Sequence, residues 1–190
     1  MIEKIIALDQ ELFLYLNNLG TTTWDPFWLL ITDKWTAIPL YALLLFLIYR
    51  RFGLKGTLIT IVLVALMITC TDQLANLFKH GFERPRPCGQ EGVMEATRFM
   101  AVRCGRFGYF SAHASNSTAL AVFIGILLKS KYPKLIYFLL FWAIVVVYSR
   151  IYVGVHYPLD VITGMLIGTL LALIFTYFHK LLFRRFNITF

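Results

Sequence analysis

The sequence predicts an all-α fold: a polytopic transmembrane bundle of five to six helices with an N-terminal interfacial amphipathic helix. Of its 190 residues, 59% are hydrophobic and only 15% are charged, whereas a soluble domain carries about 25% charged residues. The charges gather in clusters between long apolar stretches. Segments 61–68 and 136–147 are apolar all round, which argues against a water-soluble helical bundle, because its helices would present polar faces.

The N-terminal segment 1–34 is expected to lie in the membrane interface. Its apolar side chains recur at helical spacing with polar residues between them, as in an interfacial amphipathic helix; they are Ile2, Ile5, Ile6, Leu12, Phe13, Leu16 and Leu19. An aromatic cluster suited to headgroup depth follows, at Trp24, Phe27, Trp28 and Trp35. Two interpretations of 24–34 stay open, a re-entrant segment and an extension of the first span. The opening Met1-Ile2-Glu3-Lys4 does not have the pattern of a cleavable signal peptide, so we expect the spans to direct insertion.

Five stretches form the predicted bundle, 35–181, within one domain, 1–190. They are 35–49, 57–78, 112–128, 135–148 and 159–178. A bilayer core of about 30 Å needs about 20 helical residues. The first and fourth stretches are short by that measure, so we expect them to extend past Lys34 and Arg150. The longest connection is the 79–111 loop.

The distribution of basic residues orients this bundle. Because connections alternate between sides, 50–55, 129–134 and the C-terminus share one side. That side carries nine basic and no acidic residues, namely Arg50, Arg51, Lys55, Lys129, Lys131, Lys134, Lys180, Arg184 and Arg185. By the positive-inside rule it is cytoplasmic. The 79–111 loop and the 149–158 turn then face the periplasm or exterior of a multi-pass inner (plasma) membrane protein.

The formal net charge of +8 does not indicate nucleic acid, because the basic residues flank apolar stretches instead of forming one water-exposed face. The expected partners are the lipid bilayer and an anionic lipid or phosphate. Nothing in the sequence indicates an oligomeric state.

Two of the three cysteines, Cys88 and Cys104, fall in the outer loop. An oxidising compartment permits a disulfide there, and closing such a loop stabilises the fold by about 3 kcal/mol in the chain-entropy model. We predict this bridge; two unpaired thiols are the alternative. Cys70 lies within the second span and is interpreted as a small, inert apolar residue.

Three polar clusters fall at the ends of spans on the outer side. The first runs from Lys79 to Pro87, the second is Ser111-Ala112-His113, and the third runs from Ser149 to Asp160. If the helices bundle, the clusters meet. From them we select two histidines, one carboxylate, three cations and a helix N-terminus as the candidate site: His113, His156, Asp160, Lys79, Arg86, Arg150 and the start of the third span.

This set is suited to a phosphate. Lys79, Arg86 and Arg150 can hold phosphate oxygens, the arginines in bidentate fashion. Ser111 and the backbone N–H groups that open the third span, at Ala112, form an anion site. A basic residue at a span end is usually a snorkelling anchor, and a lone interfacial histidine is usually structural. The combination of all three clusters is what indicates a site.

The histidines supply the reactive groups. His156 can attack phosphorus if a neighbour fixes its tautomer, and Asp160, four residues later, is within reach. His113 can protonate the leaving oxygen and then activate water. One carboxylate beside three cations does not suit a two-metal site. The sequence therefore predicts phosphoryl transfer without a metal or other cofactor.

The clusters resemble the signature of the type 2 phosphatidic acid phosphatase superfamily: Lys-x6-Arg-Pro, Pro-Ser-Gly-His and Ser-Arg-x5-His-x3-Asp. The resemblance covers about residues 72–164 by motif. It implies that His156 is the nucleophile, Asp160 its partner and His113 the acid and then base, with phosphate held by Lys79, Arg86, Ser111 and Arg150. The second motif departs from the pattern, because Phe110 replaces Pro and Ala112 replaces Gly. Alanine still offers a backbone N–H unless the position needs a positive φ.

Asp72 and Asn76 precede Lys79 by seven and three residues and share roughly one helix face with it. An ionisable residue within a span is a functional hypothesis by default. Asp72 is interpreted as orienting Lys79 or lining the pocket, with an ordinary buried polar pair as the alternative.

The predicted function is hydrolysis of a phosphomonoester or pyrophosphate on a membrane lipid, through a phosphohistidine, at the outer face. Within the family, small chains of this layout resemble undecaprenyl diphosphate phosphatases, which is the first expectation. Phosphatidylglycerophosphate, phosphatidate and lipid A phosphatases share the motifs and stay open. A non-enzymatic lipid or phosphate transporter, a membrane scaffold and a vanadate-dependent haloperoxidase are the rivals, the last disfavoured because those proteins are soluble.

Overall fold

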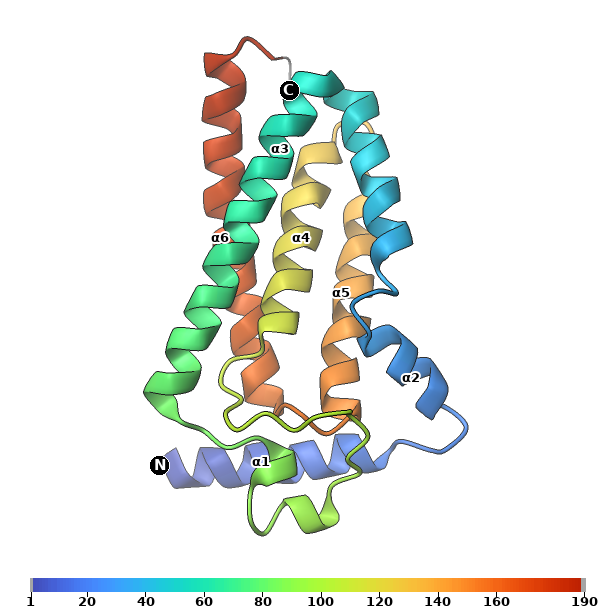
Figure 1. Cartoon of the computed structure of the whole chain (residues 1–190), viewed down its shortest axis with the longest axis vertical. Coiled ribbons are helices and arrows are strands. Elements are labelled where there is room, and N and C mark those ends of the chain that lie inside the picture. The colour runs from blue at the N-terminus through green and yellow to red at the C-terminus, as the bar shows by residue number, and fades with distance from the viewer. Residues whose placement is uncertain (1, 189–190) are drawn as a thin grey trace.

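The computed structural model describes residues 2–188, which form six α-helices (Figure 1). They are α1 (Ile2–Asn18), α2 (Asp25–Thr32), α3 (Ile38–Phe82), α4 (Ala112–Leu128), α5 (Leu135–Tyr152) and α6 (Pro158–Arg185). Two short 3₁₀ turns, Pro87–Gly89 and Met94–Ala96, lie in the long loop, and residues 2–188 contain no β-strand. The predicted all-α fold is confirmed. Met1 and the last two residues of the predicted 1–190 domain lie outside the described residues.

The helix α3 contains the first two predicted spans. Its backbone leaves the helical region at Gly53 (φ 64°, ψ −173°), and the chain reverses there at the upper end of Figure 1. The two limbs of α3 therefore form a hairpin, as the polar connection at 50–55 predicts.

The expected extension of the first span past Lys34 is wrong, because α3 begins at Ile38 and α2 is a separate helix. Residues 33–37 form a turn in which Asp33 Oδ1 accepts a hydrogen bond from the Trp35 N–H at 3.1 Å. Pro39 lies in the first turn of α3, where its missing N–H costs nothing, whereas inside a continuous helix it would break the hydrogen-bond ladder. The corresponding extension of the fourth span is confirmed, since α5 continues through Arg150 to Tyr152.

The helix α1 lies across one end of the bundle (Figure 1). Its buried residues are Asp9, Phe13 and Asn17, one every four positions. The Asn17 side-chain amide donates to the carbonyls of Ile151 (3.0 Å) and Tyr152 (2.8 Å), which attaches α1 to the end of α5. Large apolar side chains on the rest of α1 are exposed, including Ile2, Ile5, Leu8 and Leu12. The helix is amphipathic, with its polar anchors turned toward the protein.

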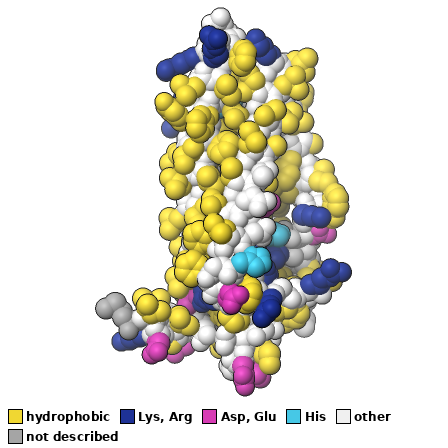
Figure 2. All heavy atoms as spheres, turned by 60° about the vertical axis from the view of Figure 1, so that its left-hand side comes forward, with side chains coloured by type: hydrophobic (Ala, Val, Ile, Leu, Met, Phe, Trp, Pro, Cys, Tyr) yellow, Lys and Arg dark blue, Asp and Glu magenta, His cyan; other side chains and the backbone are white. Residues whose placement is uncertain are grey.

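The bundle is apolar on the outside. The helices α3, α5 and α6 are long and apolar enough to cross a membrane, and α4 is a shorter apolar helix of 17 residues. Figure 2 shows apolar side chains along the length of one face, with Lys and Arg at its upper end and again in its lower half. Exposed apolar side chains include Leu43, Phe46, Ile61, Phe141 and Leu170. Such a surface is suited to acyl chains, and the chain is a membrane protein.

The connections group at the two ends as the alternation of spans predicts (Figure 1). The turn at Gly53, the 129–134 connection and the end of α6 share one end. The loop between α3 and α4, the short turn between α5 and α6, and α1 share the other. The three polar clusters therefore lie at the same end of the bundle.

Candidate active site

The turn between α5 and α6 presents His156. Gly154 has φ 81°, and a Cβ there would lie 3.1 Å from the Arg98 carbonyl oxygen and 3.0 Å from Thr97 Cγ2, so the turn requires glycine. Pro158 then opens α6, and Asp160 accepts a hydrogen bond from the Tyr157 N–H at 3.0 Å, as the third residue of a capping box does. The start of α6 therefore fixes the position of the Asp160 carboxylate.

The same carboxylate faces His156. Its Oδ2 lies 3.4 Å from His156 Nδ1, at the long end of the hydrogen-bond range. His156 is 2% exposed and Asp160 is fully buried. Burial lowers the pKa of His156 to about 4, although the hydrogen bond and charge of Asp160 raise it. Near neutral pH the imidazole is uncharged, and with Nδ1–H donated to Asp160 its free lone pair is on Nε2.

Three cations approach the two histidines. Arg86 comes from the loop, Lys79 from the last turn of α3 and Arg150 from the last turn of α5. All three charges act on His113, and both arginines act on His156. Arg86 donates its Nε–H to the Phe107 carbonyl at 3.0 Å, which fixes the orientation of its guanidinium.

Arg150 and Lys79 retain donors without protein partners. Arg150 donates Nη1–H to Thr32 Oγ1 of α2, but its buried Nε has no partner. Across residues 2–188, no hydrogen bond or ion pair joins the Lys79 ammonium to another side chain. Buried or half-buried donors of this kind are suited to an anion.

The N-terminus of α4 closes the set. Ser111 is its N-cap: Oγ accepts from the Ala114 N–H at 3.4 Å, and the Ser111 N–H donates to the Asp160 carbonyl at 3.0 Å. Ala112 and His113 follow with backbone N–H groups that have no partner within the helix. Ala112 is not among the residues with positive φ, so alanine takes the place of glycine without strain. His113 is exposed, whereas His156 is buried.

Of the two supporting residues, the structure brings Asp72 toward the site and not Asn76. Asp72 Oδ1 accepts from Asn116 Nδ2 at 2.9 Å, and the charge of Asp72 acts on Lys79. Asn76 is exposed, and its carbonyl is hydrogen-bonded to His80 Nδ1 at 2.8 Å. The sequence analysis missed Asn116, although its place one helical turn after His113 was a usable signal.

The sequence motifs did not indicate two charged residues near Asp160, namely Arg84 and Asp9. Arg84 donates from Nη1 to Asp160 Oδ1 at 2.8 Å and from Nη2 to Asp9 Oδ2 at 2.5 Å. A signal for Arg84 was the repeated Arg-Pro in Arg84-Pro85-Arg86-Pro87. Asp9 belongs to no motif.

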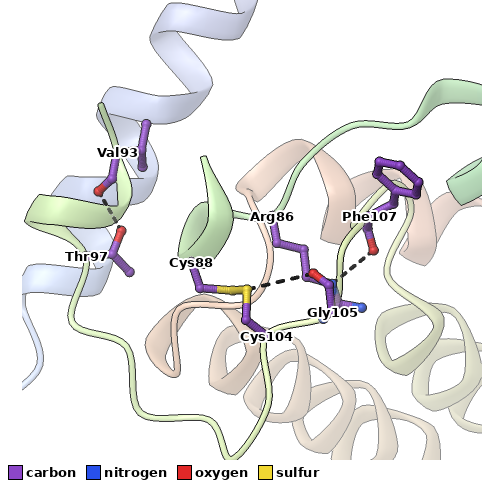
Figure 3. The surroundings of a disulfide bond; sticks show 7 residues. All are labelled: Arg86, Cys88, Val93, Thr97, Cys104, Gly105 and Phe107. Carbon is purple, nitrogen blue, oxygen red and sulfur yellow. Dashed lines mark hydrogen bonds between the residues drawn. A yellow bond between two sulfur atoms is a disulfide. The ribbon is translucent and has the colours of Figure 1, made fainter. Parts of the chain in front are cut away.

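The loop that carries Arg86 is held on both sides. Cys88 and Cys104 form a disulfide close to Arg86 and Gly105 (Figure 3). Pro85 and Phe107 form an isolated antiparallel bridge. The disulfide and the bridge hold the backbone on both sides of Arg86. Among the described residues, no three His, Cys, Asp or Glu side chains cluster as a metal site would need.

Known proteins that resemble this chain are phosphatases by name. The PAP2 superfamily model matches residues 56–184. The lipid A 4'-phosphatase of Bacteroides thetaiotaomicron is 35% identical over 95% of this chain and 81% of its own. The lipid A 4'-phosphatase of Porphyromonas gingivalis is 32% identical, with 90% and 72% covered. The undecaprenyl-diphosphatase of Sulfolobus acidocaldarius is 31% identical, with 88% and 76% covered.

Two solved structures share the fold. The crystal structure of Aquifex aeolicus LpxE has a TM-score of 0.67 and 26% identity, covering 87% of this chain and 92% of that one. A transmembrane PAP2-type phosphatidylglycerolphosphate phosphatase from Bacillus subtilis has a TM-score of 0.73 and 20% identity, covering 93% and 87%. At that identity, the second likeness supports the fold alone.

Proposed function

We propose that this chain hydrolyses the phosphate monoester of a lipid A-type glycolipid, since it belongs to the PAP2 superfamily and is a membrane lipid phosphatase. Two relatives named lipid A 4'-phosphatase support this substrate, the first at 35% identity over 95% of the chain. Undecaprenyl diphosphate, our first expectation from the sequence, has weaker support, because the relative named for it is 31% identical. In this proposal the motif residues bind the phosphoryl group. Because all the candidate substrates carry that group, the motifs alone could not show which lipid is preferred.

The buried His156–Asp160 pair beside three cations is the observation that carries the mechanism. In the first step the phosphate occupies the space bounded by Lys79, Arg86, Arg150 and the N-terminus of α4, where Ser111 and Ala112 lie. The arginine forks match pairs of phosphate oxygens, and the α4 backbone N–H groups add uncharged donors.

In the second step His156 Nε2 attacks phosphorus and the bond from phosphorus to the sugar oxygen breaks. The leaving oxygen takes a proton from His113, whose protonated form the negative charge of the bound phosphate stabilises. His156 becomes a phosphorylated, positively charged imidazole, and Asp160 stabilises that charge through Nδ1–H. The two exposures fit these roles: the nucleophile is buried, and His113 is exposed where a leaving group departs.

In the third step water attacks the phosphohistidine. His113, now neutral, accepts a proton from the water as the P–N bond breaks. Inorganic phosphate leaves, His156 returns to the neutral imidazole, and His113 is protonated for the next cycle. The scheme balances without a further reactant.

The site is proposed to face the periplasm or exterior, with the C-terminus in the cytoplasm. The nine basic residues at the opposite end support this orientation by the positive-inside rule. A transporter with the same anion site would bind the lipid phosphate without releasing phosphate.

The test is phosphate release from purified 4'-phosphorylated lipid A and from undecaprenyl diphosphate. We expect the lipid A phosphate to be preferred and His156→Ala to form no covalent phosphate. His113→Ala should lose about 100- to 10,000-fold on the sugar ester, the range typical of acid–base catalysis, and less on the pyrophosphate, whose leaving group needs little protonation. Acid-labile, base-stable phosphate trapped from labelled substrate identifies the intermediate.

His80→Ala is the matched control, because His80 is exposed and bonds to the Asn76 carbonyl at the end of α3; it should keep wild-type turnover. Substantial turnover by His156→Ala would refute the mechanism. A preference for undecaprenyl diphosphate would overturn the proposed substrate and leave the mechanism standing.

A further inference from the structure

Asp9 is a buried acid on the inward-facing stripe of α1, a helix whose remaining large apolar side chains are mostly exposed. It is 4% exposed, and both of its carboxylate oxygens are engaged. Oδ1 accepts from the Leu159 N–H at 2.9 Å in the first turn of α6, and Oδ2 accepts from Arg84 Nη2 at 2.5 Å. Burying a carboxylate costs free energy even with such partners, so Asp9 is expected to serve a function at this position.

Arg84 joins Asp9 to the candidate site. Its second nitrogen, Nη1, donates to Asp160 Oδ1 at 2.8 Å, and its guanidinium carbon lies 4.2 Å from the centre of the Tyr157 ring. Asp160 has its other oxygen, Oδ2, turned to the Tyr157 N–H and His156. A continuous chain of contacts therefore runs from α1 to the candidate nucleophile: Asp9, Arg84, Asp160, His156.

We propose that Asp9 is a positioning residue of the reaction, which balances the charge of Arg84 so that Asp160 keeps its full negative charge for His156. Arg84 and Asp160 alone would form a neutral pair. With Asp9 ionised, the three groups carry a net charge of −1. This proposal rests on the proposed function, because it concerns the positive charge that His156 acquires when it is phosphorylated.

The other charges near His156 make that balance necessary. The charged or titratable groups that act on His156 or Asp160 from the surrounding elements are Lys79 of α3, Arg84 and Arg86 of the loop, His113 of α4, Arg150 of α5, Tyr157 before α6 and Asp9 of α1. Most are cations, which disfavour an imidazolium. Asp160 is the carboxylate in contact with His156. Asp9 offsets the positive charge of Arg84, which is hydrogen-bonded to Asp160.

The test compares Asp9→Asn with the wild-type enzyme on 4'-phosphorylated lipid A in detergent micelles. The amide removes the charge but keeps an oxygen for the Leu159 N–H. We expect kcat and the single-turnover rate of phosphohistidine formation to fall about 10-fold, the effect of roughly one pKa unit of lost stabilisation, with KM changed less than about twofold. Asp9→Glu should restore most of the rate. Glu11→Gln, the same charge change at an exposed position of α1, should match the wild type.

The pH profile gives a readout that an anchoring role would not move. Burial raises the pKa of Asp9 above its ordinary value, although Arg84 and the Leu159 N–H lower it. The wild-type kcat should therefore lose the contribution of Asp9 as pH falls through that raised pKa. Asp9→Asn should already be slow at neutral pH and lack this partial decline. A kcat at the wild-type level, with only KM or thermal stability affected, would overturn the proposal.

The double variant Asp9→Asn/Arg84→Gln tests charge balance directly, because it returns the net charge on the three positions to −1. It should be faster than Asp9→Asn alone, and an equal or slower rate would overturn the proposal. If Asp9→Asn does not accumulate in folded form, the double variant decides: kcat within about threefold of the wild type supports the proposal, and a loss of about 10-fold refutes it. Absence of trapped phosphohistidine in the wild type would instead be a failure of the proposed function.

Discussion

Gly108 lies against the reacting groups of the candidate site. Its N–H donates to the Arg84 carbonyl at 2.9 Å. A Cβ built on it would lie 3.1 Å from Asp160 Oδ2, 3.1 Å from Arg86 Cγ and 3.7 Å from His156 Nδ1. A single methyl group here therefore crowds Asp160 and Arg86 and comes into ordinary contact with His156, so Gly108→Ala is a probe of how closely the proposed site is assembled.

The size of the effect follows from these distances. Ordinary contacts of a Cβ begin at 3.4 Å, so Asp160 Oδ2 and Arg86 Cγ must each move by about 0.3 Å or more, by the difference from 3.1 Å. The Asp160–His156 contact is already 3.4 Å long, and a further displacement weakens it. A misplacement of about 1 Å can cost about 100-fold in rate. We expect a loss of about 10-fold in kcat/KM, or about 1.4 kcal/mol of transition-state stabilisation.

The assay is phosphate release from 4'-phosphorylated lipid A at matched concentrations of folded enzyme. Gly81→Ala is the control, because a Cβ at Gly81 meets nothing within 4 Å and alanine favours the helix by up to about 1 kcal/mol. It should keep wild-type activity. Full activity of Gly108→Ala would refute the close approach, and an equal loss in both variants would assign the effect to general destabilisation.

Two further predictions concern sidedness and pH. On a Cys70→Ser background, an impermeant thiol reagent should label Met94→Cys in intact cells and Lys131→Cys only after lysis; the opposite pattern would overturn the outer site. The pKa of His156 is lowered to about 4, so its imidazole is neutral and nucleophilic above that pH, and kcat/KM should fall in proportion to acid only near pH 4. Because Asp160 raises this pKa, Asp160→Asn should move the acid limb to lower pH, and a wild-type limb near 6.5 would contradict the burial of His156.

The helices and the motif residues could be predicted because each has a local signal. The second and third predicted spans match the second limb of α3 and α4 closely, since each contains a long apolar segment and has a charged residue, Lys79 or Lys129, directly after its last turn or within it. Asp160 could be placed beside His156 because a spacing of four residues into a helix start brings the two side chains together. The start of the first span could not be predicted, because aromatic and apolar residues recur throughout 24–37. The turn that begins at Asp33 separates α2 from α3.

Arg84 and Asn116 could have been found by helical spacing or repetition within a motif, whereas Asp9 could not. It lies 151 positions before Asp160 in a helix read from its apolar residues, and a charge on such a helix is ordinarily assigned to the solvent side. In this protein the outer surface is apolar and the interior of the end that holds the site is polar. The stripe Asp9, Phe13 and Asn17 is therefore turned inward, with Asp9 toward Arg84 and Asn17 toward the end of α5.

This reversal has a consequence for α1 as a whole. In the proposed interfacial position, α1 contacts lipid with its apolar side chains and Arg84 with its buried carboxylate, so one helix sets both its depth in the interface and the charge beside Asp160. A soluble enzyme would separate the two functions, because its surface helices bury apolar faces and leave charges in water. We propose that in this protein the membrane covers the apolar face of α1, which leaves the polar face to contact the candidate site.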